Sequence, residues 1–205
     1  MKYLTHLLRL FLGITFIISG MIKLNDPMGF SFKLEDYFAP NVLGLPFLIP
    51  FALTFAIFVC IVEVVLGVML LVGYQKKLTL WSLLAMLIFF GFLTFYSAYF
   101  NKVTDCGCFG DALKLSNWAT FAKNVVLLVM IISILYFEKY HKPYLSPLPS
   151  RLIAFSFFLF SIILSVYCLQ NLPLIDFLPY KIGNNIHKLM EIPDGAPRDE
   201  YETTF

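Results

Sequence analysis

Charged residues are scarce in this sequence. Asp, Glu, Lys and Arg make up 14% of its 205 residues, whereas soluble globular proteins contain about 25%. Hydrophobic residues make up 60%, and a net charge of +2 is too small to suggest a protein that binds nucleic acid. The sequence also has no glycine-rich phosphate loop, no metalloprotease motif and no internal repeat. The composition therefore indicates an integral membrane protein.

Five apolar segments are long enough to cross a bilayer, whose hydrocarbon core of about 30 Å needs about 20 helical residues. Backbone groups inside lipid must be hydrogen-bonded within their own segment, so each segment is predicted to be a helix. The predicted fold class is an all-α membrane protein. The segments are 3–24, 47–74, 78–100, 117–137 and 152–169.

The first segment could instead be a signal peptide, because a basic start precedes an apolar run. However, no Ala-x-Ala-like cleavage site follows, since a cut after Gly20 would place Ile18 in the position three before it. Arg9 also interrupts the apolar run. We therefore expect a retained transmembrane helix.

Basic residues predict the orientation of the chain. With five spans, the N-terminus and the connections 75–77 and 138–151 share one side and are rich in Lys and Arg. The opposite connections, 25–46 and 101–116, have fewer basic residues, mixed with acidic ones. The positive-inside rule then places the N-terminus in the cytoplasm. In a bacterial inner membrane, the loop 101–116 and the C-terminal tail would face the oxidising periplasm.

The four cysteines differ in their setting. Cys60 lies deep in the second segment and is expected to be an ordinary core residue. Cys106 and Cys108 are one residue apart in a polar loop, where a disulfide would close a small strained ring that Gly107 relieves in part. Strained, exposed disulfides are easily reduced, which favours a redox-active pair. Cys168, at the outer end of the fifth segment, could act as a resolving thiol.

Residues near the pair support thiol chemistry only in part. Ser116 or Asn117 can cap the next helix, and its N-terminus together with Lys123 would favour a thiolate. The negative charges of Asp105 and Asp111 would instead favour the protonated thiol. Two alternatives stay open: a structural disulfide that stiffens the loop, and a metal site.

The metal alternative would use the two cysteines together with Asp105 and Asp111. The loop has no histidine and only two thiolates, whereas structural zinc usually takes four nitrogen or sulfur ligands. We therefore expect no metal.

Glu63 lies in the middle of the second segment, where an ionisable group is costly and by default functional or paired. Counted from the cytoplasmic ends of their helices, Arg9 lies about 9 Å deep and Glu63 about 16 Å deep. An arginine side chain can bridge that difference, so we predict an ion pair between Arg9 and Glu63. Gly67, one turn away, would let the helices approach closely. The pair could fix helix packing or belong to a proton or substrate path.

The connection 25–46 begins with Asp26 before Pro27, which favours a turn. Aromatic and charged residues then alternate in a pattern that suits a short amphipathic helix at the membrane interface. This helix could be a lid over the outer mouth of the bundle or a simple anchor. Lys23 and Asp26 could pair at the end of the first helix.

Two stretches resemble a known family. "ISGMIKLNDPMGFSFKLEDYF" resembles the first-helix signature of the DoxX family, and "DCGCFGDALKLSNWATFAKN" is similar to the cysteine loop of its MauE-type members. The resemblance covers about residues 5–140. It implies a DoxX-like four-helix transmembrane bundle, to which this chain adds a fifth transmembrane helix. By motif match, the positions carried over are Lys23, Asp26, Cys106 and Cys108.

The resemblance also implies thiol or sulfur redox chemistry. MauE-type proteins accompany a thioredoxin-like partner in maturing a disulfide-rich methylamine dehydrogenase subunit, and DoxX relatives include a component of a thiosulfate:quinone oxidoreductase. A quinone is the cofactor to consider, and the aromatic residues Phe95, Tyr96 and Tyr99 could receive it, although such residues are usually an interfacial belt.

Three domains are expected: a bundle at 1–140 that carries the amphipathic loop 25–46 and the cysteine loop 101–116, a fifth helix at 141–170, and a periplasmic tail at 171–205. The tail resembles that of DoxX-like proteins of Bacteroidetes, in which a soluble domain follows, so it reads as a linker to a missing domain.

The predicted function is thiol–disulfide exchange, or protein maturation, at the periplasmic face of the bacterial inner membrane. The expected partners are the lipid bilayer, a thioredoxin-like or disulfide-containing periplasmic protein, or a membrane complex. One alternative is a non-enzymatic membrane anchor or complex subunit with a structural disulfide between Cys106 and Cys108. Another is a small-molecule transporter built around Glu63.

Overall fold

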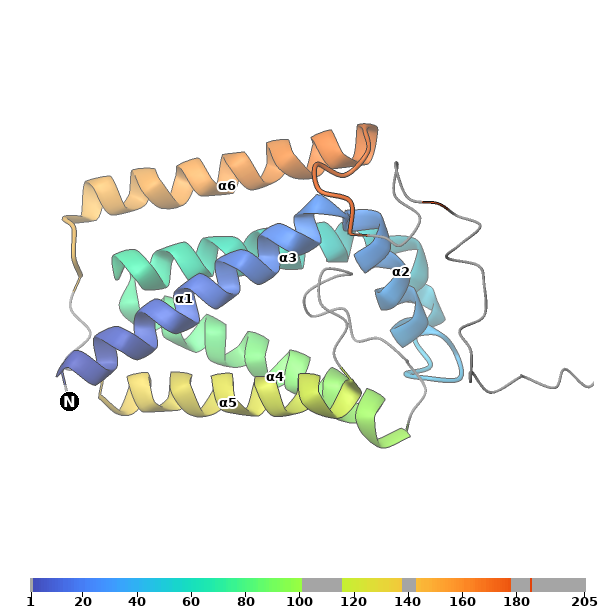
Figure 1. Cartoon of the computed structure of the whole chain (residues 1–205), viewed down its shortest axis with the longest axis horizontal. Coiled ribbons are helices and arrows are strands. Elements are labelled where there is room, and N and C mark those ends of the chain that lie inside the picture. The colour runs from blue at the N-terminus through green and yellow to red at the C-terminus, as the bar shows by residue number, and fades with distance from the viewer. Residues whose placement is uncertain (1, 101–115, 138–142, 178–184, 186–205) are drawn as a thin grey trace, which may run out of the picture. The chain divides into compact units, whose positions relative to one another are not determined.

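The computed structural model describes residues 2–100, 116–137, 143–177 and 185. These residues form helices and connections and no strand. The chain divides into two units, Met1–Ile175 and Asp176–Phe205, and the helices found among the described residues all belong to the first. The helices are α1 (Lys2–Asn25), α2 (Pro27–Phe38), the 3₁₀-helix η1 (Pro46–Phe51), α3 (Ala52–Val72), α4 (Lys76–Phe100), α5 (Asn117–Tyr136) and α6 (Pro147–Gln170) (Figure 1).

Within the described residues, five helical segments are long and apolar enough to cross a membrane: α1, η1 joined to α3, α4, α5 and α6. The protein is therefore a multi-pass, all-α membrane protein, as the sequence predicted. The main difference in boundaries is at α6, which begins at Pro147 rather than at residue 152. Proline is favoured in the first turn of a helix, where its missing N–H costs nothing.

Helices α1 and α3 run antiparallel in close contact because glycines face the partner helix. A Cβ atom added to Gly67 would lie 2.9 Å from the carbonyl oxygen of Gly13, and one added to Gly20 would lie 2.6 Å from the side chain of Val64. Side chains larger than hydrogen would push the two helices apart. The close approach predicted at Gly67 is thus confirmed.

The short helix α2 follows α1 directly. The Asp26 carboxylate accepts a hydrogen bond of 2.9 Å from the backbone N–H of Gly29, and Pro27 occupies the first turn, so the Asp-Pro pair starts the helix. Its buried face, which includes Phe30, Leu34 and Phe38, packs against α3. The predicted short helix is confirmed. We call the end of the bundle at which α1, α4 and α6 finish the α2 end, and the other the N-terminal end.

Two large apolar clusters and a small third one, formed by Tyr37 and Leu93, lie among the described residues of the unit. Cluster I lies toward the N-terminal end and joins α1, α3, α4 and α5, with one residue from α6. Cluster II lies toward the α2 end and joins α1, α2, α3 and α6. The buried members of cluster I are Leu12, Phe16, Leu66, Met69, Leu70, Leu80, Leu83, Leu87, Leu127, Ile131, Ile134 and Ala154. Those of cluster II are Leu24, Phe30, Leu34, Phe38, Ala52, Ala56, Cys60, Ile61, Val64, Leu164 and Cys168.

Helix α6 packs against α3 and α1, and Figure 1 shows it on the opposite side of that pair from α4 and α5. Its buried positions are all small or medium-sized, which lets the helix lie close to its neighbours. They are Ser150, Ala154, Ser161, Leu164, Ser165 and Cys168.

Candidate functional site

The most unusual feature inside the bundle is an ion pair between Lys23 of α1 and Glu63 of α3. The Lys23 ammonium contacts the Glu63 carboxylate, and the two side chains are only 2% and 6% exposed. A charged pair at this depth must compensate the cost of leaving water, so it is retained where it has a structural or functional role.

The Lys23 ammonium also lies against two aromatic rings. The ring centroids of Phe30 in α2 and Phe90 in α4 are 5.1 Å and 5.0 Å from its nitrogen. Both distances are within the range of cation–π attraction. Lys23 therefore links α1 to α2, α3 and α4.

The prediction that Glu63 pairs with Arg9 was wrong, because Lys23 occupies that position and Arg9 binds the end of α3. Its guanidinium donates hydrogen bonds of 2.7 Å and 2.5 Å to the carbonyl oxygens of Leu70 and Leu71, in the last turn of α3. Carbonyl groups at a helix C-terminus have no partner inside the helix and carry partial negative charge, so they attract a cation. The guanidinium also lies 4.1 Å from the ring centroid of Tyr144, whose backbone N–H donates to Val72.

The predicted pairing of Lys23 with Asp26 was wrong as well. Lys23 reaches inward to Glu63, and Asp26 serves as the N-cap of α2. Of the four positions carried over from the family motifs, Lys23 and Asp26 thus have defined places at the junction of α1 and α2.

A small cavity of about 30 Å³ lies beside the ion pair and is lined by α1, α3, α4 and α5. A cavity of this size has room for one or two water molecules. Polar groups line much of it: Lys23, Glu63, Lys123, Asn124, Thr15 and Ser19. The remaining lining residues, Phe16, Leu87, Phe90 and Leu127, are apolar.

Asn124 joins this cavity to a second buried polar contact. Its side-chain amide donates a hydrogen bond of 3.1 Å to the Thr94 hydroxyl, which itself lies within hydrogen-bonding distance of the Phe90 and Gly91 carbonyls. Sequence reasoning missed Asn124 and Thr94. The available signal was an amide next to Lys123 in an otherwise apolar segment, since buried polar side chains in a membrane must find partners.

The arrangement can hold water next to a carboxylate and two ammonium groups and can exchange protons with that water. Among the described residues, no three His, Cys, Asp or Glu side chains come together to hold a metal ion.

Cys60 and Cys168 are both buried members of cluster II and have free thiols. The prediction that Cys60 is a core residue is confirmed. Cys106 and Cys108, and with them Asp105 and Asp111 of the metal alternative, lie outside the described residues. The resolving role predicted for Cys168 therefore stays a prediction.

The residue that precedes α5 is described and acts as predicted. The Ser116 hydroxyl accepts a hydrogen bond of 3.3 Å from the backbone N–H of Ala119, which makes it the N-cap of α5. Lys123 lies two turns into the same helix and lines the polar cavity. Phe100 and Ser116, which flank the cysteine loop, both lie at the α2 end of the bundle.

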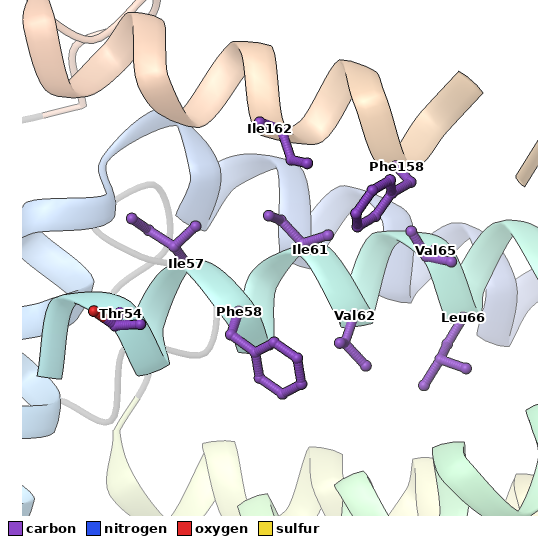
Figure 2. A pocket seen from close by; sticks show the side chains of 9 residues that line it. All are labelled: Thr54, Ile57, Phe58, Ile61, Val62, Val65, Leu66, Phe158 and Ile162. Carbon is purple, nitrogen blue, oxygen red and sulfur yellow. The ribbon is translucent and has the colours of Figure 1, made fainter. Parts of the chain in front are cut away.

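A larger cavity of about 550 Å³ lies between α3 and α6. Figure 2 shows Ile61 and Val65 of α3 turned toward Phe158 and Ile162 of α6. Among the described residues that line it, Thr54 alone is polar, and Phe58 on its rim is 62% exposed. This groove can accept a hydrocarbon chain but provides no group for chemistry.

The aromatic residues considered for a quinone have ordinary contacts. Phe95 stacks on Tyr99, with ring centroids 5.8 Å apart, and also contacts Phe121 of α5. The Tyr96 hydroxyl donates a hydrogen bond of 2.7 Å to the carbonyl of Val42 and so fixes the connection after α2. Phe95 and Tyr99 are exposed on the bundle, as expected of a membrane-interface belt.

Asn25, the last residue of α1, binds the segment that follows α6. Its side-chain NH2 group donates a hydrogen bond of 2.7 Å to the carbonyl oxygen of Ile175, and its side-chain oxygen accepts one of 3.1 Å from the backbone N–H of the same residue. This two-point contact holds residues 171–175 at the α2 end. A single polar residue at a helix end gives no sign of so distant a partner, and sequence reasoning did not find it.

These features define a helical membrane protein of five spans with a buried ion pair and a water-sized polar cavity in its bundle. The chain belongs to the MauE family, described as methylamine utilisation protein MauE, which matches residues 1–137. No curated protein and no solved structure matched the chain. The matched range includes α1 to α5 and the cysteine loop, whereas α6 and the tail lie beyond it.

Proposed function

We propose that this protein exchanges a disulfide, through Cys106 and Cys108, with a thioredoxin-like or other disulfide-containing protein at the periplasmic face of the bacterial inner membrane. The observation that carries the proposal is a cysteine pair, one residue apart, inside the range that matches the MauE family. A pair at this spacing forms a strained, readily reduced disulfide.

In the exchange, the thiolate of one cysteine attacks a sulfur of the partner's disulfide and releases the other partner sulfur as a thiolate. The second cysteine then attacks the mixed disulfide. The products are a Cys106–Cys108 disulfide and a reduced partner, so two electrons pass to the partner. The same steps in reverse oxidise a partner dithiol.

The proposed orientation is supported by the distribution of charge over the bundle. Arg9, Lys76, Lys77 and Arg151 all lie toward the N-terminal end, at or near the starts of α1, α4 and α6. By the positive-inside rule this end faces the cytoplasm. The α2 end, with Phe100 and Ser116 on either side of the cysteine loop, then faces the periplasm.

The test is the reduction potential of the Cys106 and Cys108 pair, measured by thiol trapping in defined redox buffers. Cys60→Ala and Cys168→Ala remove the two buried thiols from the readout. We expect a potential in the range of thioredoxin-type partners, and a Cys108→Ser variant should trap a mixed disulfide. A potential below about −300 mV is typical of structural disulfides. That value would overturn the proposal in favour of a membrane anchor or complex subunit with a permanent disulfide.

A further inference from the structure

The polar cavity beside Lys23 and Glu63 lies in the half of the bundle nearer the α2 end. Lys23 is two residues from the end of α1, and Thr15 is ten residues from it, which is about 15 Å along the helix axis. On α5, Asn124 is seven residues from the first residue of the helix, or about 10 Å. The polar lining therefore extends from near the α2 end to about the middle of the membrane.

Toward the N-terminal end, the cavity is closed by apolar side chains. Phe16, Leu87 and Leu127 both line the cavity and belong to cluster I. Behind them, Leu12, Leu83 and Ile131 have no exposed surface. An apolar layer of this kind holds no water, because water needs polar partners in a cavity.

Water inside the cavity would lower the cost of keeping charges there. The described titratable groups that face it are Lys23 from α1, Glu63 from α3 and Lys123 from α5, and α4 contributes only apolar lining residues. Buried ions are costly unless they are paired and hydrogen-bonded. A cavity of about 30 Å³ with this many polar partners meets the requirements for bound water.

We propose that the cavity is a water-binding site that exchanges with the solution at the α2 end only, and so gives the Lys23–Glu63 pair one-sided access to protons. The described lining residues of this site do not include the cysteine pair, and the test of the site does not depend on the proposed function. It also gives Glu63 a role that needs no passage of solute across the membrane, since cluster I separates the pair from the N-terminal end.

The test uses single cysteines in the full-length chain after all four native cysteines are replaced by Ala. Ser19→Cys places a thiol in the cavity lining. Ile18→Cys is the matched control, because Ile18 immediately precedes Ser19 in the same helix and is 49% exposed on the outside of the bundle. Leu12→Cys places a thiol within cluster I.

Silver ions are a suitable probe, since they are close to water in size, react with thiols in water and do not cross lipid. They are added in chloride-free buffer to one face of oriented proteoliposomes at a time. The thiols that remain are counted with a maleimide after denaturation. Asp36→Cys in α2 and Lys77→Cys near the start of α4 replace exposed residues and report which face is treated.

We expect Ser19→Cys to react at least tenfold faster than Ile18→Cys or Leu12→Cys, and only from the face that also modifies Asp36→Cys. Equal rates for Ser19→Cys and Ile18→Cys would overturn the water site. Reaction of Ser19→Cys from both faces would overturn the one-sided access. If Ser19→Cys does not purify as a folded protein, Thr15→Cys, another residue of the lining, takes its place with the same criteria.

Discussion

Lys23 and Glu63 form a buried ion pair that joins α1 to α3, and the Lys23 ammonium lies 5.1 Å from the ring centroid of Phe30 and 5.0 Å from that of Phe90. The pair is located where α1, α2, α3 and α4 meet. Its partners belong to segments that are far apart in the sequence, so it can hold these helices in one arrangement.

Removing one member of this pair should destabilise the protein strongly. In Glu63→Gln, the Lys23 charge stays buried without its counter-ion, and we expect the free energy of unfolding to fall by about 3–5 kcal/mol. The measurement is chemical unfolding in detergent. Asp36→Asn, which removes a carboxylate from the exposed face of α2, is the control and should change stability by less than about 0.5 kcal/mol.

Replacing both members with apolar residues should restore much of that loss. The double variant Lys23→Met with Glu63→Leu leaves no uncompensated charge, and apolar replacements of buried pairs are often neutral. A double variant less stable than Glu63→Gln would show that the pair itself, rather than the stranded charge, accounts for the effect.

Arg9 should be sensitive even to lysine. Its guanidinium makes two hydrogen bonds to carbonyl oxygens at the end of α3 and also packs on Tyr144. We expect Arg9→Met to cost about 3 kcal/mol or more, because hydrogen bonds to charged groups contribute about 1.5–3 kcal/mol each. Arg9→Lys keeps the charge but not the planar fork, so its loss should be intermediate. Equal stability of the two variants would contradict the geometric account.

Glycine should be required at Gly67 and not at Gly91. A Cβ atom at Gly67 would lie 2.9 Å from the Gly13 carbonyl oxygen, whereas one at Gly91 would meet nothing within 4 Å. We expect Gly67→Ala to lower stability by about 1–3 kcal/mol through overpacking. Gly91→Ala should raise it by about 0.5–1 kcal/mol, because alanine is the better helix former. Thermal unfolding of Gly67→Ala and Gly91→Ala in the same detergent tests both expectations.

Asn25 should control the segment after α6. Asn25→Leu removes both hydrogen bonds to Ile175. We expect the backbone amide of Ile175 to exchange hydrogen about tenfold faster, which corresponds to about 1.4 kcal/mol of lost hydrogen bonding. The amide of Asn171, which donates to Tyr167, is an internal control that should not change. Asn25→Asp keeps the acceptor but loses the donor, so its effect should be smaller.

The sequence by itself determined the class of protein and the local structure. Apolar segments of about 20 residues must form helices in a bilayer, because lipid cannot hydrogen-bond the backbone. Asp26 and Pro27 predict the start of α2, and Ser116 predicts the start of α5. Gly67 predicts the close contact of α1 with α3. Each of these depends on chemistry within a few residues, or on side-chain size alone.

Only the tertiary structure decided which polar groups meet. Depth counted along two helices favoured Arg9 as the partner of Glu63, yet the tilt and register of α1 bring Lys23 there instead, and Arg9 binds the end of α3. Long side chains can reach several partners at similar depth. The outcome depends on how α1, α3, α4 and α5 pack together, which also places Asn124 against Thr94 and closes the polar cavity on one side.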